Sequence, residues 1–337
     1  MWPDPTATTA RDLLTRLKHR LHIMPTVNRS ASAAGTPRVT AEAPHLWSGT
    51  LSEHSEFLEA SELYNRVFRY GSKGLALNSN LLSALVHNGG SAVGVRAPDG
   101  RLIGFAYGFP GTDGQTGYHY SQVAVVDPAW QGHGIGRMLK EVQRQVALGW
   151  GAHTMRWTFD PMFSRNGHFN FNTLRGVGVR FFEDYYGRER TDRVLVEWTL
   201  DDRPDPLASL RDLAPAADWG HDDWGQPRPD AAEDRLVWVP IDAGVVAGDT
   251  ETAEIDWGRA ALRSTLRDLY DDGRVIISCL RLTHDTSVYL TVPGELAEAG
   301  DTGGTETGPH ADHDEADATS AAEAHTSAGQ AGTEEDA

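Results

Sequence analysis

The residues best suited to chemistry in this chain form a glycine-rich turn at positions 131–137. The turn reads Gln-Gly-His-Gly-Ile-Gly-Arg and follows an apolar segment at 123–126 and the turn residues Asp127 and Pro128. The first amides of a helix have no partner inside it and carry the positive end of its dipole, so they bind anions. Glycines at these spacings let the backbone approach a phosphate and adopt angles closed to other residues. We therefore predict a diphosphate site, to which Arg137 adds a positive charge.

Two better-known phosphate motifs do not fit this turn. A dinucleotide-binding fingerprint requires a third glycine at position 137, which is arginine here, and the Gly-Lys-Ser/Thr of a P-loop is absent. A strand, then Gln-Gly-x-Gly-x-Gly-Arg, then an amphipathic helix instead resembles the acetyl-CoA loop of the GNAT superfamily of N-acetyltransferases, whose pattern is Gln/Arg-x-x-Gly-x-Gly/Ala. A glycine turn needed only for packing is the alternative interpretation. The resemblance implies that the coenzyme contacts seven consecutive residues: Gln131, Gly132, His133, Gly134, Ile135, Gly136 and Arg137.

The elements expected around this loop follow the order found in that superfamily. Hydrophobic periodicity and turn residues predict a short strand, two helices, a hairpin closed by Pro98-Asp99-Gly100, and further strands and helices on either side of the loop. The expected ranges are 46–50, a helix with Phe57 and Tyr64 on one face, 78–86, 91–97, 101–109, 118–126, 155–159, 161–174, 177–182 and 194–200. The fold class is therefore α/β, a mixed and mostly antiparallel sheet with flanking helices. The resemblance implies that 118–126 and 155–159 are a central parallel pair that splays apart beside the loop.

The gap between the two splayed strands would hold the pantetheine arm of the coenzyme. An amide-rich arm can bind the free edge of a strand much as another strand would. The edge residues are expected to be Val123, Ala124 and Val125. Asn166 matches the asparagine that opens the next helix in many members of the superfamily, and Asn170 and Asn172 compete with it for that contact.

The sequence from Met155 to Pro161, with Ser164-Arg-Asn166, resembles a sparsely described group of predicted GNAT acetyltransferases that carry an added C-terminal piece. Here that piece would be a small α+β extension at 203–294, following a GNAT domain at 46–200. It is expected to contain a helix at 257–270 capped by Asp256 and a hairpin of strands 274–282 and 287–292. We expect this extension to pack on the catalytic domain, where it either walls the acceptor site or forms the contact of a homodimer.

Acetyl transfer from acetyl-CoA to an amine requires a proton acceptor for the amine and a proton donor for the departing thiolate. The resemblance implies direct attack of the amine of a small molecule or protein on the thioester, without a metal. GNAT enzymes often use a strand carboxylate and a tyrosine, and this chain has neither at the usual positions. His119 and Asp160 are the candidate catalytic residues, with Tyr185 and Tyr186 as alternative acids. A half-buried strand histidine, a helix-capping aspartate and a non-catalytic acyl-CoA-binding module are the competing interpretations.

The composition limits the classes of molecule that the protein is expected to bind. The 337 residues carry a net charge of −18, and residues 295–337 hold twelve Asp or Glu and no Lys or Arg. This acidic tail is expected to be disordered, because it has too few apolar residues to offset chain entropy. A flexible, mildly basic extension is expected at 1–45. The overall charge argues against nucleic acid as a partner, and the absence of a long apolar run argues against a membrane and for a cytoplasmic protein. The single Cys279 is expected to be buried and inert.

Overall fold

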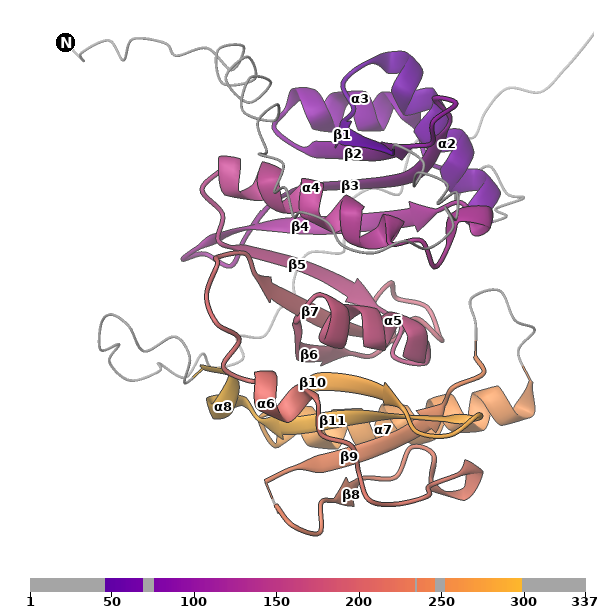
Figure 1. Ribbon diagram of the computed structural model, residues 1–337, viewed down its shortest axis with the longest axis vertical. Helices are drawn as coiled ribbons and strands as arrows, with labels where there is room; N and C mark the ends of the chain where they lie inside the picture. The colour runs from indigo at the N-terminus through magenta and orange to yellow at the C-terminus, as the bar shows by residue number, and fades with distance from the viewer. Residues whose placement is uncertain (1–45, 69–75, 234, 246–251, 299–337) are drawn as a thin grey trace, which may run out of the picture. The chain divides into compact units, whose positions relative to one another are not determined.

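The structure is a computed structural model that describes residues 46–68, 76–233, 235–245 and 252–298 (Figure 1). Within these ranges the strands form one eleven-stranded sheet in the order β1-β2-β3-β4-β5-β7-β6-β10-β11-β9-β8. The strands are β1 (Trp47–Thr50), β2 (Ser91–Arg96), β3 (Leu102–Thr112), β4 (Gly117–Val126), β5 (Thr154–Phe159), β6 (Val177–Phe182), β7 (Arg193–Thr199), β8 (Arg228–Pro229), β9 (Val237–Asp242), β10 (Arg274–Arg281) and β11 (Thr286–Pro293). The helices are α2 (His54–Phe68), α3 (Ser79–His87), α4 (Ile135–Gly149), α5 (Ser164–His168), α6 (Ala208–Arg211), α7 (Ala253–Asp271) and α8 (Gly294–Glu298), with short turns η2 (Pro128–Trp130), η3 (Phe169–Thr173) and η4 (His221–Asp223).

The predicted fold class is confirmed. In the described part of the sheet β4 and β5 are parallel, and the other strand pairs are antiparallel. Helices cover both faces around β3. Phe57 of α2 and Leu82 of α3 pack with Phe105 on one side, whereas Ile135 and Leu139 of α4 pack with the other side of the sheet. The sheet thus holds α4, and the loop before it, against the strands that flank the parallel pair.

The strands beyond residue 203 continue the same sheet. Strand β10 pairs with β6 through Ile276 and Gly178, and the predicted hairpin β10–β11 is present. Strand β9 pairs along β11 from Thr286 to Thr291, and we did not predict this strand within the Asp/Pro/Trp-rich segment. Figure 1 shows this part of the sheet, drawn in orange and yellow, continuing from β6.

Two predicted helix starts are wrong. The helix expected from Pro161 begins at Ser164, because Asp160 accepts a hydrogen bond from the Met162 amide and holds a turn before the helix. It is divided into α5 and the π-helical η3. Helix α7 begins at Ala253, where the Thr252 side chain accepts the amide of Ile255. The predicted cap, Asp256, therefore lies inside the first turn, where a carboxylate still favours the helix dipole.

The predicted flexible extension at 1–45 and nearly all of the predicted acidic tail lie outside the described residues. No helix in the described ranges combines the length and apolar character needed to span a bilayer.

Candidate functional site

The glycine turn is an exposed loop directly before α4. Residues 131–134 are exposed, and Ile135 is buried as the first residue of the helix. Gly132 and Gly134 have φ of +83° and +78°, a conformation that side chains rarely adopt. A Cβ at either position would meet no atom within 4 Å. These glycines are therefore required by backbone conformation and not by packing, and they leave open the space that an anion needs.

The surroundings of the loop supply donors and positive charge. Gly134 is the N-cap of α4 and offers no side chain to satisfy the first helical amides. Asp127 caps the turn η2 at the other end of the loop. Arg165 of α5 lies 3.5 Å from the Gln131 side-chain oxygen, so a second arginine besides Arg137 adjoins the loop. Arg165 lies next to the loop through its contact with Gln131, which is 34 residues away in the sequence. A local sequence pattern does not reveal such a contact.

Strands β4 and β5 separate after a very short ladder. Their parallel pairing consists of His119 with Met155 and Tyr120 with Arg156, near the start of each strand. Beyond Tyr120 the described part of β4 pairs only with β3, on its other edge. Ala124, one of the three predicted edge residues, is exposed there. The strands thus form a V whose closed end lies at Tyr120 and whose mouth faces the glycine loop.

A β-bulge in β4 changes the face of the sheet on which the following side chains lie. Val123 pairs with Tyr107 and Ser121 with Gly108, so Gln122 is an extra residue without a partner on β3. On one side of the bulge Val123 and Val125 pack towards α2 and α3, whereas Ser121 faces α4. Such bulges locally bend a strand and increase its twist, which suits a strand that leaves its neighbour.

His119 lies on the α4 side of the sheet, away from open solvent. Its side chain is 0 % exposed, stacks on Trp150 and hydrogen-bonds through Nε2 to Ser91 Oγ, 2.8 Å away. Burial lowers its pKa to about 3. In this conformation the imidazole is neutral and hard to protonate at neutral pH, which argues against the predicted role of general base.

Asp160 follows β5 and is held by cations. Its carboxylate lies 3.1 Å from Arg259 of α7 and 3.9 Å from Arg193 of β7, and it also accepts the Met162 amide. With these partners the carboxylate is 9 % exposed. The contacts show a capping and ion-pairing group that joins α7 to β5 and β7, which argues against a free catalytic base.

Tyrosines gather at the closed end of the V. The hydroxyls of Tyr120 on β4 and Tyr185 in the β6–β7 loop lie 3.2 Å apart, and the ring of Tyr185 contacts that of Tyr186. Burial raises the pKa of Tyr120 above its usual value of 10, and the contact with Tyr185 raises it further, so the phenol stays protonated at neutral pH. Tyr185 is 37 % exposed. Sequence reasoning named Tyr185 and Tyr186 but missed Tyr120, because nothing local brings β4 next to the β6–β7 loop.

The three competing asparagines are in different environments. Asn170 is buried and accepts a hydrogen bond from the Trp157 indole. Asn172 accepts the Cys279 amide and donates to the Ser278 hydroxyl, which fixes it against β10. Asn166 is exposed at the start of α5. The structure therefore leaves Asn166 as the asparagine with a surface available to a ligand, and its role remains a prediction. The described residues contain no cluster suited to a metal ion.

The chain is similar to one family model and to several solved structures. Residues 57–164 match the model of the acetyltransferase (GNAT) family. No curated protein sequence matches the chain. Solved structures that resemble it include yncA of Salmonella typhimurium, a presumed acetyltransferase seen with acetyl-CoA (18% identity, TM-score 0.38, 47% of this chain and 95% of that one). Another is the ribosomal-protein-S18-alanine N-acetyltransferase of Escherichia coli (14% identity, TM-score 0.36, 48% of this chain and 97% of that one).

Proposed function

We propose that this protein transfers an acetyl or short acyl group from acetyl-CoA to the amine of a small molecule or protein, by direct attack on the thioester. The observation that carries the proposal is the open loop with left-handed Gly132 and Gly134, placed at the mouth of a V that closes at Tyr120. A family match over residues 57–164 supports it.

The residues present fit the coenzyme. Space for a diphosphate exists where a Cβ at Gly132 or Gly134 would stand, and the helix amides and Arg137 supply the positive potential. The free edge at 123–125 and the exposed Asn166 suit an amide-rich arm. When bound, acetyl-CoA supplies an activated acyl thioester.

Proximity and phenol hydroxyls provide the remaining chemistry in this proposal. Holding an amine beside a thioester can lower the barrier by several kcal/mol without a strong base. Tyr120 and Tyr185 share a hydrogen bond at the closed end of the V, and the protonated phenol of Tyr120 is able to donate a hydrogen bond to a departing thiolate, which takes its proton from the attacking amine or from solvent. Amine deprotonation is then left to solvent, because His119 is buried and Asp160 is ion-paired.

The burial of His119 and the ion pairing of Asp160 also favour a second candidate function, an acyl-CoA-binding module without transfer chemistry. Release of free thiol from acetyl-CoA across a panel of amines separates the two functions. An enzyme releases thiol in an amine-dependent manner, whereas a binding module shows saturable CoA affinity and no such release.

A glycine substitution tests the coenzyme site itself. Gly134→Glu places a carboxylate where the diphosphate would bind, and we expect CoA affinity to fall about 100-fold or more, measured by calorimetry on the full chain. Gly151→Glu is the matched control, because Gly151 also has a positive φ (+79°) and open space around its Cβ but follows the opposite end of α4. Equal CoA affinity of the two variants would contradict the proposed site.

A further inference from the structure

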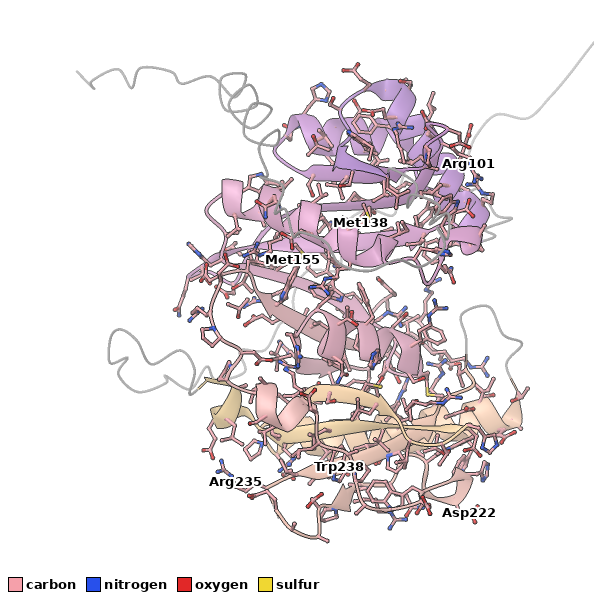
Figure 2. The ribbon with its side chains drawn as sticks, in the orientation of Figure 1. Arg101, Met138, Met155, Asp222, Arg235 and Trp238 are labelled. Atoms are coloured by element: carbon pink, nitrogen blue, oxygen red, sulfur yellow. The ribbon has the colours of Figure 1, made fainter. Side chains whose placement is uncertain are left out.

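Lys140 is a buried amine at the closed end of the V. The chain has three lysines, Lys18, Lys73 and Lys140, among its 30 Lys and Arg residues. Lys140 is on the sheet-facing side of α4 and is 3 % exposed. Its Nζ lies 2.9 Å from Ser121 Oγ on β4 and 4.0 Å from the sulfur of Met155 on β5, a residue labelled in Figure 2. The amine therefore bridges the two strands just where their pairing ends.

In the described part of the chain no carboxylate compensates this amine. Among the described residues no Asp or Glu oxygen lies within ion-pairing distance of Lys140 Nζ. Besides the Ser121 hydroxyl, Nζ lies over the face of the Trp157 ring, 3.7 Å from the ring centroid. A cation over an aromatic face gains about 0.5 to 2 kcal/mol, which is less than the several kcal/mol needed to bury an ammonium ion. Burial accordingly lowers the pKa of Lys140 well below 10.5, which favours the neutral amine.

The hydrogen bonds around Lys140 leave a lone pair for chemistry. Nζ donates to Ser121 Oγ, and the Ser121 hydroxyl in turn donates to Gln143 Oε1, 2.9 Å away. A neutral amine with its two N–H groups directed at the Ser121 hydroxyl and the Met155 sulfur keeps its lone pair, and within the described ranges no N–H or O–H group donates to Nζ. A desolvated neutral lysine of this kind is a nucleophile.

A coenzyme bound at the glycine loop can place its thioester near Lys140. Lys140 is five residues beyond Ile135, about 7.5 Å along the axis of α4. The pantetheine arm is longer than this distance, so a thioester carried into the V from a diphosphate at the loop can reach the closed end. An acyl carbonyl bound there would lie near Nζ.

We propose that Lys140 is a self-acylation site, where the Nζ amine takes the acyl group of bound acyl-CoA when no other amine is present. This inference rests on the proposed function. The lone pair of Nζ forms a bond to the thioester carbonyl carbon, the carbon–sulfur bond breaks, and the proton lost from nitrogen ends on the sulfur. The products are an acyl-lysine amide and free CoA thiol, and no oxidant or reductant is needed.

The test uses the full chain incubated with isotope-labelled acetyl-CoA and no acceptor amine, followed by peptide mass spectrometry. We expect Lys140 to be labelled at least about tenfold faster than Lys18 and Lys73, because holding the reactants together far exceeds the effect of random collision. The same chain unfolded in denaturant is the control for intrinsic reactivity, and there the preference for Lys140 should vanish. The Gly134→Glu variant should lose the Lys140 label, and the Gly151→Glu variant should keep it.

The outcomes are distinguishable. Saturable CoA binding with Lys140 unlabelled, or labelled no faster than the two other lysines, overturns self-acylation and leaves the proposed function standing. Failure of the chain to bind CoA overturns both. In a Lys140→Met variant we expect CoA binding to persist and the dominant label to disappear, whereas a label that stays at its full level on another residue contradicts the assignment.

Discussion

At the scale of single residues, local spacing and tertiary context determine different parts of the site. Gly132 and Gly134 adopt positive φ because a short turn into a helix requires it, and their spacing between an apolar strand and an amphipathic helix predicted the loop. His119 could not be placed in the same way. Its alternation predicts a face shared with Val123 and Val125, but the bulge at Gln122 puts it on the opposite face, under α4. The bulge depends on pairing with β3, which the sequence of β4 does not encode.

The burial of His119 predicts a measurable acid sensitivity. Its pKa is about 3 in the folded chain and near 6.5 when unfolded. Below pH 6.5 the unfolded state therefore takes up a proton that the folded state does not, so stability is complete above pH 6.5 and falls as the pH drops towards 3. At pH 5 the loss is about 2 kcal/mol.

Urea unfolding at pH 7.5 and pH 5 measures this effect. We expect the free energy of unfolding of His119→Gln to fall by about 2 kcal/mol less than that of the unmodified chain between the two pH values. His54→Gln is a matched control on the exposed first turn of α2 and should behave like the unmodified chain. An identical loss in all three proteins would show that His119 does not titrate as the structure indicates.

At the scale of elements, strands with strong periodicity were predicted with their ends, whereas the starts of two helices were misplaced. The predicted strands at 118–126, 155–159 and 177–182 agree with β4, β5 and β6 within one residue. The start of α7 was misplaced because Asp256 looks like a cap, whereas Thr252 has the extended backbone that a cap requires. Asp256 instead pairs with Arg190 at the surface.

This difference between two capping residues gives a prediction for α7. Thr252→Ala removes the acceptor of the Ile255 amide and should lower the free energy of unfolding by about 1 kcal/mol. Asp256→Ala removes only an exposed ion pair and a favourable dipole contact, and should cost less than about 0.8 kcal/mol. Denaturant unfolding of both variants measures which substitution lowers the free energy of unfolding more. A larger loss for Asp256→Ala would show that Asp256 is the cap, as predicted from sequence.

At the scale of the whole described chain, the segment after residue 203 is tied to elements before residue 200 by buried polar contacts. Arg211 of α6 is 1 % exposed and donates to the backbone carbonyls of Phe171, Gly176 and Ile277, while its Nε pairs with Asp205. The Tyr289 hydroxyl donates to the carbonyl of Pro161. Sequence reasoning expected packing of an extension here. It could not predict one continuous sheet, because the β6–β10 pairing joins residues about a hundred positions apart.

Loss of the Arg211 contacts should weaken the whole molecule. Arg211→Met leaves several buried carbonyls and the Asp205 carboxylate without their donor, and we expect the free energy of unfolding to fall by about 3 to 5 kcal/mol. Arg235→Met is the control, since Arg235 is half-exposed and pairs with Glu295 at the surface, and it should cost less than about 1 kcal/mol. Thermal and urea unfolding measure the stability of the two variants. Equal stabilities would contradict the stabilising role of the buried Arg211 contacts.

Cys279 lies at this same junction. It is the single cysteine of the chain, 1 % exposed on β10, with its sulfur 3.4 Å from the carbonyl of Ser164 at the start of α5. Burial raises its pKa, so the reactive thiolate is scarce while α5 covers it. An alkylating dye added to the native protein therefore reacts with Cys279 only in molecules where α5 has separated from β10. The rate of alkylation then measures the rate or the population of that local opening.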